Sequence, residues 1–432
     1  MTYKQTLEFL YSSLPMYQRT GAAAYKNSLE TTFALDEAHG HPHRKFKSVH
    51  IAGTNGKGSV AHMLASVLQT AGYKTGLYTS PHLVDFRERI RVNGKMIGEK
   101  EVMNYVKNNR SLIEELEPSF FEMTVDLAFM YFAAREVEIA IIETGMGGRL
   151  DSTNIVDPVL SIITNIGMDH MRFLGDSIEK IAREKGGIIK PDTPLVVGEY
   201  REDSMKVFRE LTEKNHSKLI LAEEHVIHEH GLMMPDRRIN HRFRSRTAVY
   251  DNLVCDLTGN YQVKNLKTVI TALEELTRTG MEISAPAIYQ GLAEVKMNTG
   301  LRGRWEELGY NPLVICDTAH NPDGVGEIVD QIRNTPWKKL HMVWGMVNDK
   351  DTDAILKLLP EDAVYYFTKA DIPRALDEKR LFRAAMDLGL RGRHYPDVHS
   401  AYMAAISDSG RGDLVFIGGS SFVVAEILGK FG

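Results

Sequence analysis

Hydrophobic and polar residues follow two different spacings along the chain, and segments of the two kinds alternate. Short apolar runs predict buried strands, whereas longer segments with apolar residues every three or four positions predict helices. In the first two thirds of the chain, strands are predicted at 48–53, 75–79, 138–144, 159–165 and 194–197, and helices at 59–71, 121–135, 178–185 and 263–277. This alternation is typical of βαβ units and predicts a mostly parallel sheet.

A second alternating series begins near residue 313. Its strands are predicted at 313–317, 341–345, 364–368 and 414–418, and its helices at 324–333, 354–359, 381–388 and 422–428. The preceding segment 294–302 has the Gly, Asn and charged residues of a linker, so we place a domain boundary there. The expected domains are residues 1–298 and 299–432.

Residues 217–258 differ from both series because they are polar, rich in His and Arg, and without helical spacing. We predict short antiparallel strands and loops there. The basic residues are not interleaved with aromatic residues that could stack on bases. A solvated face is therefore favoured over a patch that binds nucleic acid.

Composition narrows the class of protein. Of the 432 residues, 43% are hydrophobic and 25% charged, with a net charge of −5, which is ordinary for a globular protein. Without a basic excess we expect neither nucleic acid nor a membrane as a partner. No apolar run approaches the ~20 residues of a membrane-spanning helix, and Lys4 and Glu8 make the start of the chain a poor signal peptide. Two cysteines, Cys255 and Cys316, are too few for a disulfide framework, so a reducing cytoplasm fits best.

A glycine-rich loop, GTNGKGS at residues 53–59, separates the first predicted strand of the series from its first helix. Glycines let backbone N–H groups approach phosphate oxygens, and a helix N-terminus favours negative charge. Lys57 would reach the β- and γ-phosphates of a nucleotide, and Ser59 would offer a hydroxyl near Mg²⁺. The spacing departs from G-x-x-x-x-G-K-[ST], because the first gap is two residues and Gly58 separates the lysine from the serine. A tight turn without a ligand is the alternative, but the lysine and the position after a strand favour a nucleotide.

Polar residues also follow other predicted strands, at the edge where open α/β sheets bind ligands. Glu143 ends one strand, and an acidic residue there suits Mg²⁺, which prefers oxygen ligands. Capping of a turn is the alternative for this carboxylate. Ser80 follows another strand and could contact a metal, although alone it is an ordinary turn serine.

Two further positions leave alternatives open. His170, after Asp169, follows a predicted strand as Glu143 does, so a role in a site and a structural role are equally open. Lys185 ends a predicted helix, where pairing with the helix dipole is the usual interpretation.

The second domain carries its own polar strand end. Asp317 and His320 lie on one short loop after a predicted strand, which is more polar chemistry than a turn needs. Arg304 lies at the linker, and an arginine there is a plausible clamp for the negative charge of Mg-ATP.

Taken together, these motifs resemble the folylpolyglutamate synthase/dihydrofolate synthase family, relatives of the Mur ligases. The matching runs follow the family's order along nearly the whole chain. They are GTNGKGS at Gly53–Ser59, TSPHL at Thr79–Leu83, RERIRVNG at Arg87–Gly94, FFEMT at Phe120–Thr124, ETGMGGRLDSTN at Glu143–Asn154, NIGMDHMRFLG and EKGGI around His170 and Lys185, GNYQVKN at Gly259–Asn265, RGRWE near Arg304, DTAHNP at Asp317–Pro322, NDKD at Asn348–Asp351 and a final GGSSFVVAEIL.

The resemblance implies roles residue by residue. The residues that would bind ATP are Asn55, Gly56, Lys57, Gly58, Ser59, Asn265, Arg304, Asp317 and His320. Ser80 and Glu143 would hold one Mg²⁺, and Glu143 and His170 a second. Lys185 is similar to the family's carbamylated lysine, a metal-ligating anion, which replaces the interpretation as a dipole partner. Lys57, Lys185 and His170 would be catalytic, and Ser119, Phe121 and Asp151 would lie on the pterin side.

The chain departs from the family at a few positions. Arg302 and Tyr261 stand where Pro and His are common, which leaves local nucleotide contacts open. Gly186 and Thr318 replace other small residues and change little.

The pattern and the resemblance together predict an α/β fold: a P-loop-type, mostly parallel domain with a small antiparallel region, and a smaller Rossmann-like domain. The resemblance implies ligation of L-glutamate to dihydropteroate, to the glutamate tail of reduced folates, or to both, through an acyl phosphate made from ATP. We expect a cytoplasmic monomer with two Mg²⁺ sites.

Two alternatives are less favoured. A Mur-type ligase acting on a UDP-linked cell-wall precursor typically has Thr after the loop lysine, where this chain has Gly58. A P-loop switch or motor would need no site of the Asp317 type.

Overall fold

The computed structural model describes residues 1–15 and 28–431, and its chain divides into two compact units. Unit 1 comprises Met1–His82 and Phe86–Leu301, and unit 2 comprises Leu83–Asp85 and Arg302–Gly432. Both units are α/β and built on mostly parallel sheets, which confirms the predicted fold class. In the described part of the chain, every helix is too short or too polar to cross a bilayer.

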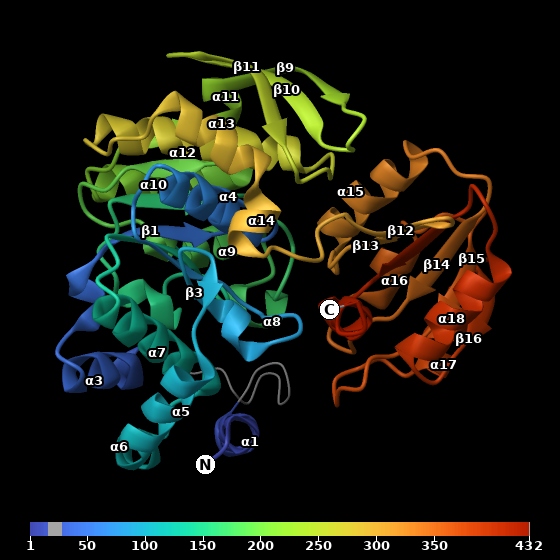
Figure 1. Ribbon diagram of the computed structural model, residues 1–432, viewed down its shortest axis with the longest axis horizontal. Helices are drawn as coiled ribbons and strands as arrows, with labels where there is room; N and C mark the ends of the chain where they lie inside the picture. Colours follow the sequence, from blue (N-terminus) through green and yellow to red (C-terminus); the bar gives the residue numbers. More distant parts are fainter. Residues whose placement is uncertain (16–27, 432) are drawn as a thin grey trace. The chain divides into compact units, whose positions relative to one another are not determined.

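Unit 1 is built on an eight-stranded sheet with the order β4-β3-β2-β5-β1-β6-β7-β8 (Figure 1). The strands are β1 (Lys47–Ala52), β2 (Thr75–Tyr78), β3 (Ile90–Val92), β4 (Lys95–Met96), β5 (Ile139–Glu143), β6 (Leu160–Ile163), β7 (Leu195–Val197) and β8 (Leu219–Leu221). Strands β2, β5, β1, β6, β7 and β8 are parallel. At one edge, β3 is antiparallel to both β2 and β4.

Helices cover both faces of this sheet. Alternate side chains of β5 enter different cores, as the two-residue period of a strand requires. Ile139 and Ile141 pack with α4 (Lys57–Thr70), α12 (Gln262–Arg278) and α13 (Ala285–Ala293), whereas Ala140 and Ile142 pack with α5 (Glu99–Asn108) and α7 (Phe120–Ala134). The other helices of unit 1 are α1 (Tyr3–Ser13), α3 (Glu30–Ala38), α6 (Arg110–Leu116), α8 (Met171–Leu174), α9 (Ile178–Lys185), α10 (Glu202–Lys214), α11 (Ala222–His225) and α14 (Val295–Thr299), with 3-10 turns η2 (Pro42–Lys45), η3 (Phe86–Arg89), η4 (Ser152–Ile155) and η5 (Gly186–Ile188).

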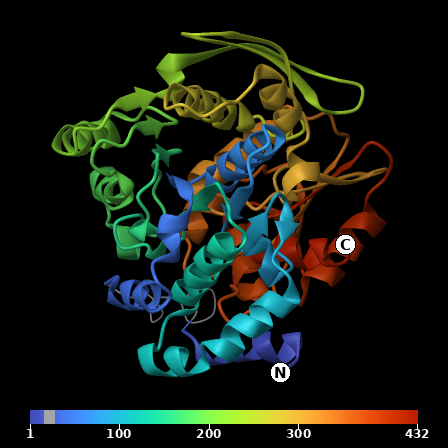
Figure 2. The ribbon, with the colours of Figure 1, turned by 60° about the vertical axis from the view of Figure 1, so that its left-hand side comes forward.

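Helix α4 is enclosed on all sides. Every residue from Gly58 to Leu68 is buried, as expected for a helix whose small and apolar residues surround its axis. Helices α12 and α13 lie against its outer side (Figure 2). The helix that begins at the glycine-rich loop is therefore held by packing along nearly its whole length.

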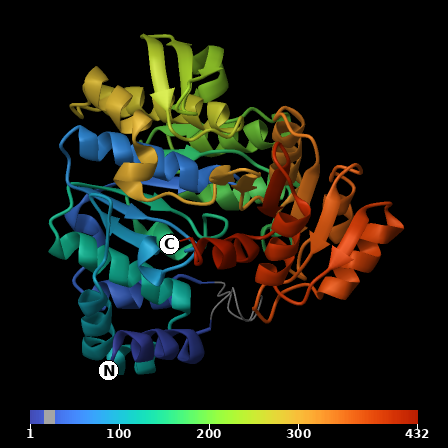
Figure 3. The ribbon, with the colours of Figure 1, turned by 45° about the vertical axis from the view of Figure 1, so that its right-hand side comes forward.

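Two segments correct the sequence analysis. Within the region predicted as antiparallel, residues 219–221 instead form β8, which extends the parallel sheet beside β7, because the run LIL is apolar although its neighbours are polar. The antiparallel prediction is confirmed for β9 (Val226–Met233), β10 (Ile239–Ser245) and β11 (Val249–Cys255), which form a separate three-stranded sheet over α12 and α13 (Figure 3). The segment predicted as a linker contains α14, whose Val295 and Thr299 are buried.

Unit 2 has a six-stranded sheet of order β12-β13-β17-β14-β15-β16. Its strands are β12 (Glu306–Tyr310), β13 (Leu313–Cys316), β14 (Leu340–Trp344), β15 (Val364–Phe367), β16 (Arg391–His394) and β17 (Leu414–Gly418), and its helices are α15 (Pro322–Arg333), α16 (Thr352–Leu356), α17 (Glu378–Asp387), α18 (Val398–Asp408) and α19 (Ser421–Leu428). Strand β12 is antiparallel to β13, and the other pairs are parallel.

Candidate functional site

The predicted site residues of unit 1 follow strands that are neighbours in its sheet. Strands β2, β5, β1 and β6 are adjacent and parallel, so their carboxyl ends lie in a row along one edge. Ser80 comes just after β2, Glu143 ends β5, the glycine-rich loop follows β1, and His170 lies in the segment after β6. This edge is where open α/β sheets bind ligands.

The glycine-rich loop has the strand–loop–helix context that a phosphate-binding loop requires. Gly56 is the N-cap of α4 with φ 85°, and Lys57, Gly58 and Ser59 form the first turn of that helix. A Cβ atom at Gly56 would lie 2.4 Å from Oδ1 of Asn265 on α12. Only glycine fits at this position. The contact also shows that Asn265, one of the predicted ATP-binding residues, lies against the loop.

The loop is also fastened to the segment after β6. The backbone N–H of Asn55 donates to Oδ1 of Asn165 at 2.9 Å, and the hydroxyl of Thr164 donates to the Asn55 carbonyl at 2.6 Å. The N–H of Gly167 donates to the Thr54 hydroxyl at 2.9 Å. These bonds fix the backbone of Asn55, and they involve residues that sequence analysis did not single out, although Asn165 lies in the NIGMDHMRFLG run.

The side chains of Lys57 and Ser59 contact neighbouring backbone and helix groups. Nζ of Lys57 donates to the carbonyls of Gly53 at 3.0 Å and Thr54 at 3.3 Å. The buried hydroxyl of Ser59 accepts from Nε2 of Gln262 at 3.3 Å.

Gln262 links two of the predicted ATP-binding residues. Its Oε1 accepts from Nδ2 of Asn265 at 2.7 Å, while its Nε2 donates to Ser59. Gln262 and Asn265 are three residues apart on α12, so they share one face of the helix. The sequence signal for Gln262 was its place in the GNYQVKN run.

Lys185 is buried beside the phosphate loop. Lys185 is the last residue of α9, and only 4% of it is exposed. Its Nζ donates to the Gly53 carbonyl at 2.8 Å. Burial, with the nearby positive charge of Lys57, lowers the pKa of Lys185 to about 7, against the opposite effects of Asp169 and Asp151. Near pH 7 a large share of this amine is therefore neutral and nucleophilic.

Glu143 and Ser80 are neighbours at the adjoining strand ends. Glu143 is 5% exposed, and the backbone N–H of Ser80 donates to its Oε2 at 3.3 Å. A buried carboxylate next to a serine offers oxygen donors of the kind that suits a hard divalent cation.

His170 stands at the start of α8 in the left-handed conformation, with φ 52°. Its backbone N–H donates to Oδ1 of Asp169 at 2.8 Å, and its ring Nε2 lies 3.8 Å from Oδ2 of the same aspartate. Its side chain is 27% exposed, so the imidazole reaches the surface of this edge.

Two of the predicted pterin-side residues surround the loop after β5. Phe121 lies so close to Gly145 that a Cβ there would be 2.5 Å from the ring. The buried carboxylate of Asp151 accepts from the backbone N–H groups of Gly145 at 2.8 Å and Met146 at 2.9 Å. Burial raises the pKa of Asp151, while these donors oppose that rise. Asp151 therefore holds the loop that follows Glu143.

Ser119 has a structural role in helix initiation. Its hydroxyl accepts from the Glu122 backbone N–H at 3.2 Å, and Glu122 Oε2 accepts from the Ser119 N–H at 2.7 Å. This capping box starts α7 and places Phe121 in its first turn.

In unit 2, the structure brings Arg304, Asp317 and His320 together around Thr318. Asp317 is 3% exposed, and its carboxylate accepts from the backbone N–H groups of Trp305 at 2.7 Å and Ala319 at 2.9 Å. Arg304 donates to the Thr318 hydroxyl, and Nδ1 of His320 lies 2.9 Å from the Thr318 carbonyl. Arg302, one of the departures from the family, pairs with Glu306.

Comparison with known proteins identifies the same two regions. The chain matches the Mur ligase middle domain over residues 51–273 and the Mur ligase, glutamate ligase domain over residues 303–421. It is 34% identical over 399 residues to the dihydrofolate synthase/folylpolyglutamate synthase of Bacillus subtilis, a match that covers 90% of this chain and 91% of the relative.

Solved structures agree over the whole length. Mycobacterium tuberculosis folylpolyglutamate synthase complexed with ADP and AMPPCP has a TM-score of 0.90 at 29% identity, covering 100% of this chain and 99% of the other. A bifunctional folylpolyglutamate synthase/dihydrofolate synthase with Mn, AMPPNP and L-glutamate bound has a TM-score of 0.86 at 27% identity, covering 100% and 98%.

Proposed function

This chain belongs to the dihydrofolate synthase/folylpolyglutamate synthase family of Mur ligases, and we propose that the row of strand ends in unit 1 binds its ATP and metal. The protein is an ATP-dependent ligase that joins glutamate to folates through an amide bond. The relatives favour folates over a UDP-linked cell-wall precursor as the acceptor. The observation that supports the site best is the phosphate loop of β1 and α4, with Glu143 on the next strand of the same edge.

The reaction must activate a carboxylate, because a carboxylate anion is a poor electrophile in water. An oxygen of the folate or pteroate carboxylate attacks the γ-phosphorus of ATP, the bond to the β-phosphate oxygen breaks, and ADP leaves. In the acyl phosphate that results, the acyl carbon is attacked by the neutral amine of glutamate. The C–N bond forms, inorganic phosphate leaves, and the amine loses a proton.

Lys57 supplies positive charge to the phosphates. Its Nζ bonds two backbone carbonyls of the loop, and these weak neutral partners can be exchanged for phosphate oxygens at little cost. Charge-assisted bonds to phosphate are roughly twice as strong as neutral ones. The same lysine then stabilises the charge on the transferred phosphoryl group. Asn55, Gly56, Gly58, Ser59 and Asn265 are proposed to line the nucleotide, with Arg304, Asp317 and His320 of unit 2 contributing further contacts.

The protein uses a divalent ion together with ATP, as the manganese complex of a relative supports. We propose Ser80, Glu143 and His170 as its ligands, at two Mg²⁺ positions that share Glu143. The donor chemistry fits, since Ser80 and the buried Glu143 carboxylate are direct neighbours. A bound Mg²⁺ would neutralise charge on the β- and γ-phosphates.

We propose that Lys185 is carbamylated. Its amine, neutral in large part near pH 7, attacks carbon dioxide; an N–C bond forms, one amine proton leaves, and the product is an anion. The cation of Lys57 lies near enough to affect the Lys185 pKa, so it would stabilise the carbamate. The test is ¹³C NMR with labelled bicarbonate, where a protein-bound carbamate signal should be present in the native chain and absent from Lys185→Arg.

The acceptor range is tested with purified protein, Mg-ATP, L-glutamate and either dihydropteroate or tetrahydrofolate. ADP release that depends on both glutamate and acceptor, with a product heavier by one glutamyl residue, supports the proposal. Steady ADP release over many turnovers in the absence of glutamate and acceptor would contradict it. We propose that both acceptors react. We propose that Ser119, Phe121 and Asp151 lie on the pterin side. We also propose that the enzyme is a monomer, and light scattering would check its mass in solution. Its two cysteines are free and buried, which suits a reducing cytoplasm.

A further inference from the structure

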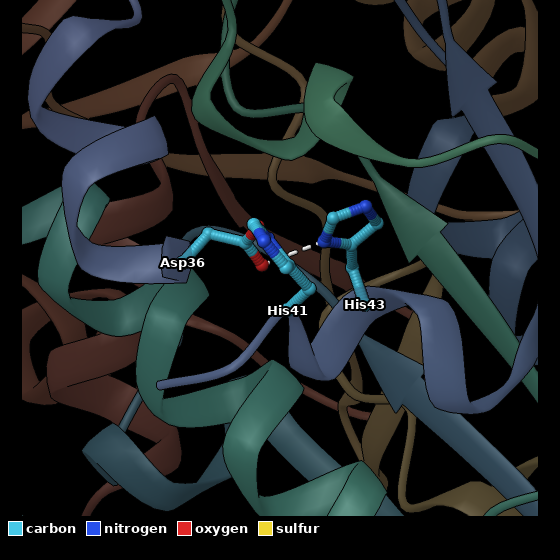
Figure 4. A group of neighbouring side chains, drawn as sticks. All are labelled: Asp36, His41 and His43. Carbon is cyan, nitrogen blue, oxygen red and sulfur yellow. Dashed lines mark hydrogen bonds and ion pairs between the residues drawn. The ribbon is translucent and has the colours of Figure 1, made fainter. Parts of the chain in front are cut away.

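Asp36, His41 and His43 form a polar cluster (Figure 4). The cluster lies at the opposite end of β1 from the phosphate loop. Asp36 lies in the last turn of α3, His41 follows that helix, and His43 lies in η2. Since η2 leads into the start of β1 and the phosphate loop follows its end, six residues of extended strand separate the two places. None of these three residues belongs to the proposed ligase site.

The two histidines contact the two oxygens of the Asp36 carboxylate. Nδ1 of His41 lies 2.7 Å from Oδ2 of Asp36, and Nδ1 of His43 lies 2.6 Å from Oδ1. The side chains of Asp36 and His43 are only 4% and 6% exposed, whereas that of His41 is 41% exposed. One potential ligand atom from each residue lies within 4.8 Å of the other two.

This set of donors is chemically suited to a late first-row divalent cation. Two imidazoles and one carboxylate are a recurring ligand set for such ions, which in zinc sites with three protein ligands take a water in the fourth position. The partial exposure of His41 leaves a side on which water can enter. An ion would replace the direct contacts between Asp36 and the imidazoles, with a small expansion of the cluster.

The surrounding residues support a defined geometry. Pro42 follows His41, which is held in the left-handed conformation at φ 56°. His39, the first histidine of the HGHPH run, instead lies 2.9 Å from both Asp126 and Asn109, so it does not compete for the same position. Thr32 lies one helical turn before Asp36, and its buried hydroxyl has no hydrogen-bond partner among the described residues. A water carried by an ion would give this side of α3 a polar partner.

We infer that Asp36, His41 and His43 bind one divalent cation of the zinc class. The ion cross-links the end of α3 to η2 and so fixes the entry into β1. This site is independent of the ligase activity and would exist whatever acceptor the enzyme uses.

The test uses the full chain without an affinity tag, stripped with a chelator and titrated with Co²⁺. We expect one equivalent to give the visible ligand-field absorption of a low-coordinate cobalt site, and Zn²⁺ to displace it. His41→Ala removes the most exposed ligand and should weaken Co²⁺ binding by more than about 10-fold, because even the loss of an outer-shell partner costs that much. Asp36→Asn, checked for folding by circular dichroism, should do the same.

Two control variants separate this site from other histidines and from the strand ends. His216→Asn changes an exposed histidine in a conformation that asparagine tolerates, and it should leave the absorption unchanged. Glu143→Ala should also leave it unchanged, because Glu143 is not a ligand of this ion. The inference is overturned if the native chain shows no such absorption, if His41→Ala binds Co²⁺ as tightly as the native chain, or if Glu143→Ala abolishes the signal.

Discussion

The loop after β1 in unit 1 and the loop after β13 in unit 2 both follow parallel strands, but they hold their charged residues differently. In the first, Nζ of Lys57 in the loop and Nζ of Lys185 at the end of α9 both donate to the Gly53 carbonyl. In the second, the carboxylate of Asp317 accepts two backbone N–H groups, those of Trp305 and Ala319. In the first loop, the lysines bond a backbone that other hydrogen bonds already fix, whereas in the second the charged group itself fixes the backbone. Replacing the charged residues should therefore separate activity from stability in the first loop and change both in the second.

The largest effect is expected for Lys57→Ala. Loss of one group that stabilises transition-state charge typically costs about 10²- to 10³-fold in turnover. The melting temperature should stay close to that of the native chain, because Lys57 bonds weak partners and is not fully buried. Glutamate-dependent ADP release measures the effect. Lys47→Ala, which changes an exposed lysine at the start of β1, is the matched control. Unchanged turnover in Lys57→Ala would remove the distinction between the loops.

Lys185→Met should abolish carbamylation and yet stabilise the fold at neutral pH. The folded-state pKa of about 7 lies below the ordinary value of 10.5, so between these values the folded chain binds fewer protons than the unfolded chain. The stability of the native chain therefore rises with pH across that window, and below pH 7 the full penalty for burying the amine is present. At about 1.4 kcal/mol per pKa unit, the penalty amounts to a few kcal/mol.

Urea unfolding in CO₂-free buffer, from pH 7 to pH 10, measures this penalty. Lys185→Met should be the more stable protein at pH 7, and its advantage should shrink as the pH rises. Lys214→Met, at an exposed lysine, should show no such trend. An advantage that grows with pH would mean that burial does not lower the pKa of Lys185.

Asp317→Asn should affect stability as well as activity. The asparagine amide has one acceptor oxygen, so either the Trp305 or the Ala319 N–H would lose its partner, at a cost of about 1–3 kcal/mol. Thermal unfolding checks this, with Asp387→Asn at an exposed position of the same unit as the control. A loss of activity with unchanged stability would make the second loop resemble the first.

The smallest effect is expected for Gly56→Ala. The positive φ of 85° costs about 1–2 kcal/mol for a residue with a Cβ. Gly72→Ala is the control, because Gly72 has φ 98° and a Cβ there would meet no atom within 4 Å. This variant therefore carries a similar backbone strain without a steric clash. If Gly56→Ala is more destabilising than Gly72→Ala, the difference in unfolding free energy measures the steric clash with Asn265. This difference should vanish in an Asn265→Ala background. An excess that persists there would show that the loop backbone, and not Asn265, is the obstacle.

Sequence alone predicted those elements whose burial produces a recognisable pattern of apolar residues. Residues 139–142 are all apolar because both faces of β5 are covered, and this made the strand easy to find. Strand β8 was missed because its three apolar residues are only half-buried at the end of the sheet. Helix α14 was missed because the Gly, Asn and charged residues of 294–302 suggest a linker. In the structure, the side chains of Asn298 and Thr299 instead contact Ser66 and His62 of α4.

For the candidate site, sequence supplied the residue types but not their surroundings. Strand ends and the family runs pointed to Glu143, His170 and the loop lysine. The burial of Lys185 and its bond to Gly53 depend on packing between segments more than a hundred residues apart, which no local pattern carries. Likewise, Gln262 links Ser59 and Asn265 only because α12 packs against the phosphate loop.

The enclosure of α4 has a consequence for the energetics of ligand capture. Packing along its length holds the helix in place when a nucleotide binds, so its first N–H groups, which have no partner within the helix, are oriented in advance. The entropy of ordering them is lost during folding, and little of it remains to be lost on binding. Changes in the helix interior, such as Ala61 or Ala65 to a larger residue, should therefore weaken nucleotide affinity without touching the nucleotide, by disturbing the preorganisation of those amides.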